Sequence, residues 1–272
     1  ADVWAASKLG KPESFIYHFG RISRVNRKID AMMLILSARE TADKGKKSAD
    51  AMHSAATEVI SSDRLRYLLH IILRLFNAVN ERSLSDSADS ANKGFSLAAL
   101  ASLSKTKTNS GETAEQYLVS RVFLHLPESL DVGADMPNIN LGKDVLITRL
   151  RADTTQLKSS VQSMKALLEL EEAEPTGENS MSEGGLTKMK EMLVEAAGCT
   201  SHAERALQDT NEDFQQICEY FAEDPSKTTP EKIFGVLVHF IRSIEHTTQH
   251  VKEKFERKNK QKKQQTQTLK QK

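Results

Sequence analysis

A heptad repeat in the last third of the chain constrains the fold more than any other feature. Its apolar and small residues alternate steps of three and four over five heptads, at Leu186, Met189, Leu193, Ala196, Thr200, Ala203, Leu207, Thr210, Phe214, Ile217 and Phe221. The repeat predicts one helix of about 36 residues, which is roughly 54 Å long. Because its stripe needs a cover, we expect residues 144–170 to pack on it as an antiparallel helix.

The predicted partner helix has an apolar spacing of its own. Apolar residues recur mostly at coiled-coil intervals, at Ile147, Leu150, Leu157, Val161, Met164 and Leu168. An acidic stretch with Gly and Pro, residues 171–185, separates this segment from the long repeat and predicts a turn. The two segments together predict a long antiparallel coiled coil.

The first third of the chain predicts further helices. Apolar residues recur at three- and four-residue steps, at Phe15, Phe19, Ile22, Val25, Ile29, Met32 and Leu36. This stripe predicts an amphipathic helix that bends near Gly20. Residues 46–60 predict a second helix, with Ala49, Met52, Ala56 and Val59 on one face. Residues 67–79 are apolar nearly all round, which predicts a helix at the centre of the core with Asp63 as its N-cap.

Short elements are expected between these helices and the coiled coil. A polar loop at 81–94 precedes two short helices near 96–104 and 112–125. At the other end of the chain, Thr229 and Pro230 predict the N-cap and first residue of a last helix.

The composition agrees with this pattern. With 39% hydrophobic and 28% charged residues, 12 Gly and 6 Pro, the chain favours long helices with charged faces over a turn-rich β fold. We therefore predict an all-α fold, an elongated helical bundle with a long antiparallel coiled-coil portion. No apolar run approaches the roughly 20 residues that span a bilayer. Two cysteines, Cys199 and Cys218, are too few for a disulfide framework and fit a reducing cytosol.

The sequence offers no convincing catalytic signature. It has no Gly-rich phosphate loop, no G-x-S-x-G turn and no dinucleotide fingerprint. His246 and His250 lie four residues apart on one helical face, but no Glu completes an H-E-x-x-H motif. Cys199 and His202 have ligand-like spacing yet fall within the heptad repeat. We predict no enzyme activity, no metal and no cofactor.

The net charge of +1 hides a basic end. Residues 252–272 hold nine Lys or Arg against two Glu, and only one apolar residue follows Arg257. Such a segment cannot bury enough surface to offset its ordering entropy, so we predict a disordered basic tail over 259–272. The tail either contacts an anionic partner or only aids solubility. Without interleaved aromatics or a reading module, nucleic-acid binding is not expected.

Three stretches, in this order along the chain, resemble the formin homology 2 (FH2) domain of formins. Residues 7–15 with 22–25 are similar to the family's L-G-x-x-E-x-F and I-P-R-L segments. Residues 72–80, 94–100 and 105–107 are similar to L-G-N-x-M-N, G-F-x-L-x-x-L and D-T-K, with Phe76, Val79 and Lys105 in place of the motif Gly, Met and Asp. Residues 220–234, YFAEDPSKTTPEKIF, resemble the family's Y-F-G-E-D-P segment most closely.

The resemblance spans residues 7–258 and implies a helical module that binds actin. In this family the lasso of one subunit encircles the post of the other, and the ring-like dimer nucleates filaments and rides the growing barbed end. It implies actin and a second formin subunit as partners, profilin–actin only indirectly, and a cytoplasmic, cytoskeletal location. We expect residues 1–258 to be the coiled coil and post, with the lasso and most or all of the knob before Ala1. The chain alone is then expected to be mostly monomeric and a poor nucleator.

The resemblance also assigns individual residues. Lys107 matches the Lys of D-T-K, which implies a contact with actin. Asn77, Asn80, Gly94 and Phe95 match the post surface that receives the partner's lasso. Without the resemblance, the two Asn would be helix C-caps, Gly94 a left-handed turn and Lys107 a solvated loop lysine.

Two other functions compete with this interpretation. One is a membrane-binding or scaffold coiled-coil protein that uses its basic tail on anionic lipid. The other is a metal-dependent hydrolase that uses His246 and His250. A lipid-bending module needs Lys and Arg along a folded face, whereas the densest positive charge here lies in the tail. The actin-binding interpretation is therefore preferred.

Overall fold

The computed structural model describes residues 10–20, 22, 24–81, 94–109, 111–173 and 183–270. Its α-helices are α2 (Lys11–Gly20), α3 (Val25–Ser61), α4 (Asp63–Glu81), α5 (Ala114–His125), α6 (Ile139–Lys143), α7 (Ile147–Ala173), α8 (Glu183–Phe221) and α9 (Pro230–Lys270). Three 3₁₀ turns join them: η1 (Leu97–Ser102), η2 (Pro127–Leu130) and η3 (Val132–Asp135). In these ranges β pairing is limited to one isolated bridge, between Lys107 and Thr113. The predicted all-α class is confirmed.

The chain forms two compact units, each described here by itself. Unit 1 consists of residues 1–49 and 147–210, and unit 2 consists of residues 50–146 and 211–272. Helices α3 and α8 therefore contribute residues to both units.

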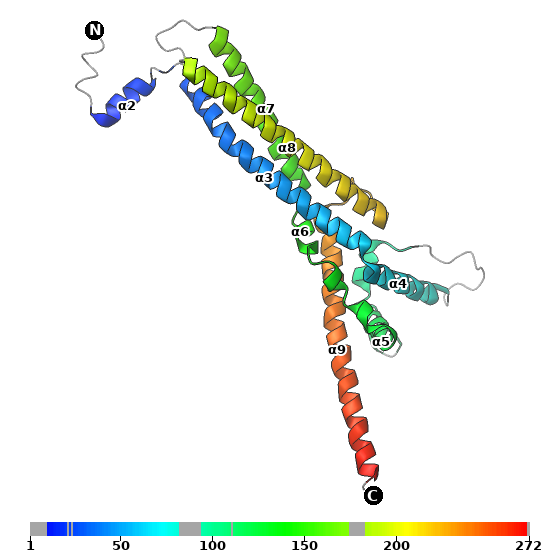
Figure 1. Cartoon of the computed structure of the whole chain (residues 1–272). Helices are drawn as coiled ribbons and strands as arrows, with labels where there is room; N and C mark the ends of the chain where they lie inside the picture. The colour runs from blue at the N-terminus through cyan, green and yellow to red at the C-terminus, as the bar shows by residue number, and fades with distance from the viewer. Residues whose placement is uncertain are drawn as a thin grey trace, which may run out of the picture. The chain divides into compact units, whose positions relative to one another are not determined.

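Unit 1 is an elongated bundle of three helices, α3, α7 and α8, which run side by side (Figure 1). Its core cluster consists of Ala31, Leu34, Ala38, Leu157, Met164, Leu167, Leu168, Met189, Ala196 and Ala203. Ion pairs join Lys158 to Glu204 and Glu172 to Lys190, so α7 and α8 are antiparallel, as predicted. The sequence did not predict that α3 would complete the bundle. It predicted a separate helix over 46–60, whereas α3 is continuous from Val25 to Ser61.

Small residues let the three helices approach closely. A Cβ placed on Gly45 of α3 would lie 3.4 Å from the Ala206 Cβ and 3.7 Å from the Ala203 Cα on α8. Larger residues at these positions would push the two backbones apart. Ala203 and Ala206 therefore allow α3 to lie close to α8 at Gly45.

Buried threonines in unit 1 satisfy their hydroxyls within their own helices. The hydroxyls of Thr154, Thr200 and Thr210 donate to the carbonyls of the residues four positions earlier, at 2.7–2.8 Å. A buried hydroxyl without a partner is costly, and this bond removes that cost. The polar positions of the heptad repeat are thus compatible with a dry seam.

The predicted stripe at the N-terminus is wrong in its direction. The expected single bent helix is two helices, because α2 ends at Gly20 and α3 begins at Val25. Arg24, between them, has a φ of 53°. Beyond the break, Ile29, Met32 and Leu36 are exposed. The buried positions of this turn are instead Lys28, Ala31, Leu34, Ile35 and Ala38. Periodicity could not choose the face, because residues 31–36 are apolar on every side of the helix.

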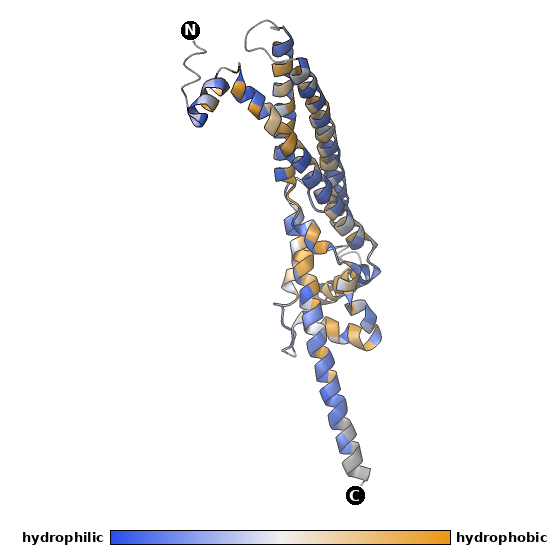
Figure 2. Cartoon of the chain, turned by 60° about the vertical axis from the view of Figure 1, so that its left-hand side comes forward, coloured by the Kyte–Doolittle hydropathy of each residue, from blue (hydrophilic) through white to orange (hydrophobic). Residues whose placement is uncertain are grey.

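Helix α9 is the central element of unit 2. It contacts α5, α6 and all three 3₁₀ turns, and its apolar residues give way to hydrophilic ones towards the C-terminus (Figure 2). Its buried residues include Ile233, Phe234, Leu237, Val238, Phe240, Ile241, Ile244 and Val251. The sequence predicted α4 for this role, and that prediction is wrong. Helix α4 buries Leu65, Leu68 and Ile72, while its other large apolar residues are only half-buried where described.

The N-termini of α9 and α4 test two predicted N-caps. The Lys232 N–H donates to the Thr229 hydroxyl at 3.3 Å, and Pro230 is the first residue of α9, as predicted. At α4, Ser62 is the cap instead of Asp63, because the Leu65 N–H donates to the Ser62 hydroxyl at 3.0 Å. Asp63 is the first helical residue and is exposed.

The last turns of α9 fall where the sequence predicts a disordered tail. The helix continues to Lys270, and residues 256–261 are exposed. An exposed helical segment depends on intrinsic propensity alone, which is marginal in water. Disorder of residues 259–272 in solution therefore stays a prediction, and residues 271–272 lie outside the described part of the chain.

Candidate protein-binding surface

Lys107 lies on a tight turn between η1 and α5 in unit 2. It pairs with Thr113 in an antiparallel bridge, and the Thr108 N–H donates to the Glu112 carbonyl at 2.8 Å. Gly111 allows the reversal because its φ is 83°, a conformation that favours glycine. The Lys107 side chain is exposed and forms no ion pair with a described residue. The turn thus presents a free ammonium group on a fixed backbone.

Helix α5 anchors this turn. Thr113 caps the helix: its hydroxyl accepts from the Gln116 N–H at 3.1 Å, and the Gln116 side chain accepts from the Thr113 N–H at 3.0 Å. Glu115 is 3% exposed and accepts hydrogen bonds from the hydroxyls of Ser243 and Thr247 on α9. A buried carboxylate that receives several donors is well compensated. These bonds fix the position of the Lys107 turn on α9.

A second set of contacts ties α3 and α4 to the turns beside α9. Glu58 accepts from the backbone N–H of Asn138 at 2.9 Å and from its side-chain amide at 2.6 Å. Asp135 accepts from the Ser62 hydroxyl at 2.8 Å and pairs with Arg64. Unit 2 is therefore held by polar contacts between segments far apart in the sequence.

The residues predicted to receive a lasso lie on two segments of unit 2. The ring of Phe95, just before η1, meets the ring of Phe76 on α4 edge-on, with centroids 5.3 Å apart and an interplanar angle of 83°. Phe76 stands where the formin motif has Gly, so the structure brings an unpredicted aromatic against a predicted site residue. The one sequence signal for this contact was that Phe76 departs from the motif.

The other predicted residues of this set fit the alternatives poorly. Asn77 is half-buried and lies four residues before the end of α4, so it is not the C-cap. Asn80 is in the last turn of α4, but its side chain lies outside the described part of the structure. Gly94 is exposed, and no positive φ is found there. The left-handed turn considered for Gly94 is therefore wrong.

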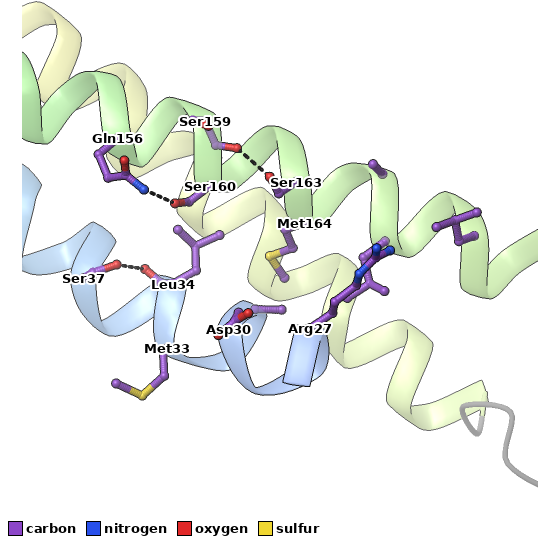
Figure 3. A pocket seen from close by; sticks show the side chains of 14 residues that line it. Arg27, Asp30, Met33, Leu34, Ser37, Gln156, Ser159, Ser160, Ser163 and Met164 are labelled. Carbon is purple, nitrogen blue, oxygen red and sulfur yellow. Dashed lines mark hydrogen bonds between the residues drawn. The ribbon is translucent and has the colours of Figure 1, made fainter. Parts of the chain in front are cut away.

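Unit 1 has a groove between α3 and α7 with a volume of about 750 Å³ (Figure 3). Its floor is apolar, and α7 contributes a row of serines at Ser159, Ser160 and Ser163. The Ser163 hydroxyl donates to the Ser159 carbonyl of its own helix at 3.1 Å. Arg27 and Asp30 of α3 also line the groove. Its apolar floor makes the groove suited to packing.

The histidines and cysteines singled out in the sequence do not converge. His246 and His250 are exposed on α9, and the described residues contain no group of three or more His, Cys, Asp or Glu suited to a metal. Burial, reinforced by Glu223 and Asp224, raises the pKa of Cys218 to about 11. Burial also raises the pKa of Cys199, which packs against the unit 1 core. Both thiols are protonated at neutral pH and serve packing.

None of the described helices combines the length and the hydropathy that crossing a bilayer requires.

Comparison with known families decides the family of the chain. The sequence profile of the Formin Homology 2 Domain matches residues 2–245. This chain belongs to the formin homology 2 family. The FH2 match contains Lys107, the Phe76–Phe95 pair and the segment 220–234, so the resemblance carried by the sequence motifs is confirmed.

Curated relatives agree with the FH2 assignment at low identity. Disheveled-associated activator of morphogenesis 1 of Mus musculus is 21% identical over 244 residues, which cover 89% of this chain and 22% of the relative. Formin-like protein 6 of Oryza sativa subsp. japonica is 26% identical over 241 residues, which cover 86% of this chain and 17% of the relative. Formin-E of Dictyostelium discoideum is 24% identical over 249 residues, which cover 89% of this chain and 15% of the relative. The FH2 chain thus spans about a fifth or less of these relatives' lengths.

Proposed function

We propose that this FH2 chain is an actin-binding module of a formin, which contributes to nucleation and barbed-end-associated elongation of unbranched actin filaments. It acts by association and catalyses no reaction. Its partners are actin, a second formin subunit through lasso and post, and profilin–actin indirectly, within the cytoplasmic cytoskeleton. The observation that carries the proposal is the Lys107 turn, which unit 2 fixes and leaves exposed.

Lys107 suits an acidic filament surface for a physical reason. Charges at the rim of an interface steer encounter and orient the partners more than they raise the final affinity. A lysine on a flexible loop would lose much of that effect to disorder. Here the bridge to Thr113 and the capped start of α5 hold the backbone that carries the ammonium group.

The Phe76–Phe95 pair supports the post assignment. Both rings are half-buried, so each keeps an accessible edge while its body is packed. Rigid aromatic side chains in this state supply large contact area at low entropic cost, as interface anchors do. We propose that Asn77, Asn80, Gly94 and Phe95 form the lasso-receiving surface, with Phe76 as a further member.

The test is actin assembly by a protein that joins this chain to a lasso and knob. We expect Lys107→Ala to slow pyrene-actin assembly several-fold and to leave the helical circular dichroism unchanged, since the side chain is exposed. The matched control is Lys105→Ala, an exposed lysine two residues earlier that stands where the family motif has Asp, so the resemblance assigns it no actin contact. Unchanged kinetics for Lys107→Ala, or an equal loss in both variants, would reject the assignment.

A further inference from the structure

A second groove lies within unit 2, between α5 and α9. It has a volume of about 270 Å³, and its lining includes Arg121, Leu124, His250, Lys254, Phe255 and Lys258. Neither the sequence motifs nor the proposed function uses these residues. The groove is therefore an independent feature of the same unit.

The groove has an apolar floor with a large exposed side chain beside it. Val251 is buried, and the ring of Phe255 packs on Phe123 with centroids 5.5 Å apart. Leu124, on the last turn of α5, is 54% exposed. An exposed leucine next to a packed aromatic offers a place for one apolar side chain of a partner.

The rim of the groove carries positive charge that the chain does not neutralise. Lys254 and Lys258 lie one turn apart on α9, and like charges at this spacing repel slightly. Arg121 reaches over the Tyr117 ring, 5.2 Å from its centroid, which holds the guanidinium in place. None of these three forms an ion pair with a described residue. An acidic partner would relieve the repulsion and supply the missing counter-charges.

The groove is continuous with the Lys107 turn. Glu112 lines the groove, and its backbone carbonyl accepts the Thr108 N–H that closes the turn. Gln116, whose side chain caps the start of α5, lines the groove as well. A partner that contacts Lys107 would therefore reach the groove by following α5.

The polar lining favours a protein over a polyanion. The amide of Gln116 and the hydroxyl of Ser120 pair as well with neutral groups as with anions, and the apolar floor at Val251 and Phe255 suits an apolar side chain, which a polyanion lacks. We propose that this groove docks an acidic, amphipathic segment of actin, with one apolar side chain at Leu124 and Phe255 and carboxylates at Arg121, Lys254 and Lys258. The proposal rests on the proposed actin-binding function and extends its contact surface along α5 and α9.

The experiment measures co-sedimentation of this chain with filamentous actin. The variant Lys254→Ala with Lys258→Ala removes two rim charges. Its matched control is Lys252→Ala with Lys260→Ala, which removes the same charge from exposed lysines of the same helix that do not line the groove. We expect the first pair to raise the Kd about tenfold and the control to change it less than about twofold. Leu124→Ser, at an exposed position, should weaken binding about threefold.

Each outcome decides a separate question. Binding by the wild-type chain that is lost in the groove pair and kept in the control supports the proposal. Equal binding by all variants, or equal loss in both lysine pairs, overturns the groove and leaves the actin-binding function standing. No binding by the wild-type chain overturns both. Co-sedimentation of the same variants with vesicles that contain 30% phosphatidylserine tests binding to lipid. If the groove pair weakens vesicle binding and leaves actin binding unchanged, the groove serves a membrane and the proposal is wrong.

Discussion

The two units of this FH2 chain are stabilised in different ways. Unit 1 packs alanines and other small residues along three long helices, and its contacts follow a sequence repeat. Unit 2 packs larger side chains around α9, and polar contacts such as Glu115 with Ser243 and Thr247 join segments about 130 positions apart. A repeat is enough to specify a bundle, whereas an irregular helical unit needs individual contacts to fix its turns.

The surfaces of the units differ as well. Unit 1 exposes apolar side chains at Ile29, Met32, Met33 and Leu36, and also on α2. Unit 2 exposes Leu124, Leu141 and Leu146 singly, and it adds a charged turn at Lys107 and a basic groove. A partner of the unit 1 face would bind by burying apolar surface, whereas charge would steer a partner towards the unit 2 face.

The largest expected effect tests the core of unit 2. Phe234 is fully buried, and a Cβ on Gly142 would already lie 3.1 Å from its ring. We expect Phe234→Ala to lower the free energy of unfolding by about 4 kcal/mol, through lost burial and the cavity it leaves. Urea unfolding followed by circular dichroism measures it. Tyr220→Ala, at an exposed aromatic, is the control and should cost below about 1 kcal/mol. Similar losses in both variants would contradict the assigned core.

The next effect tests the buried acid of unit 1. Glu171 accepts from Arg24 at 3.1 Å and Lys28 at 3.2 Å, and the Lys28 side chain is only 8% exposed. Glu171→Ala leaves that ammonium group buried without a partner, so we expect a loss of about 3 kcal/mol in the same assay. Adding Lys28→Met should recover most of the loss. Glu195→Ala, which breaks an exposed pair with Arg39, should cost below about 1 kcal/mol. If Glu171→Ala lowered the free energy of unfolding no more than Glu195→Ala does, the buried ion pair would be refuted.

The buried acid of unit 2 should be less sensitive. Glu115 receives hydroxyl donors instead of cations, so Glu115→Gln keeps one acceptor and leaves no charge unpaired. We expect a loss of about 1.5 kcal/mol, near that of a hydrogen bond to a charged group. Thr247→Val, which removes one donor with little change of shape, should cost about 1 kcal/mol. A loss from Glu115→Gln that exceeds that of Glu171→Ala would reverse the comparison of the two units.

The smallest expected effect concerns the exposed stripe of unit 1. Replacing Met32 and Leu36 by Ser should change the unfolding free energy by less than about 0.5 kcal/mol, because both are exposed. Light scattering should give a monomer before and after the change. A tight dimer that the two substitutions dissociate would show that a second copy covers this stripe, contrary to the prediction that the chain alone is monomeric.

Several elements were predictable because their physics is local. The five-heptad stripe gave α8, the spacing of Leu150 to Leu168 gave α7, and Thr229 with Pro230 gave the start of α9. The candidate site was predictable only through motifs. Lys107 came from the match to D-T-K, and no periodic pattern points to it. The Phe76–Phe95 contact and the α5–α9 groove join residues of distant segments, which single-residue matches do not relate.

The sequence by itself determined that this chain is helical, where α8 lies and where α9 begins, and that it belongs with the FH2 domains. These depend on hydrophobic period, capping and short motifs, all of which act within a few turns of chain. The tertiary structure decided that α3 joins α7 and α8, that α9 and not α4 is central, and which face of residues 29–36 is buried. Those choices depend on which apolar surfaces fill one another, and packing between distant segments has no signature in the local sequence.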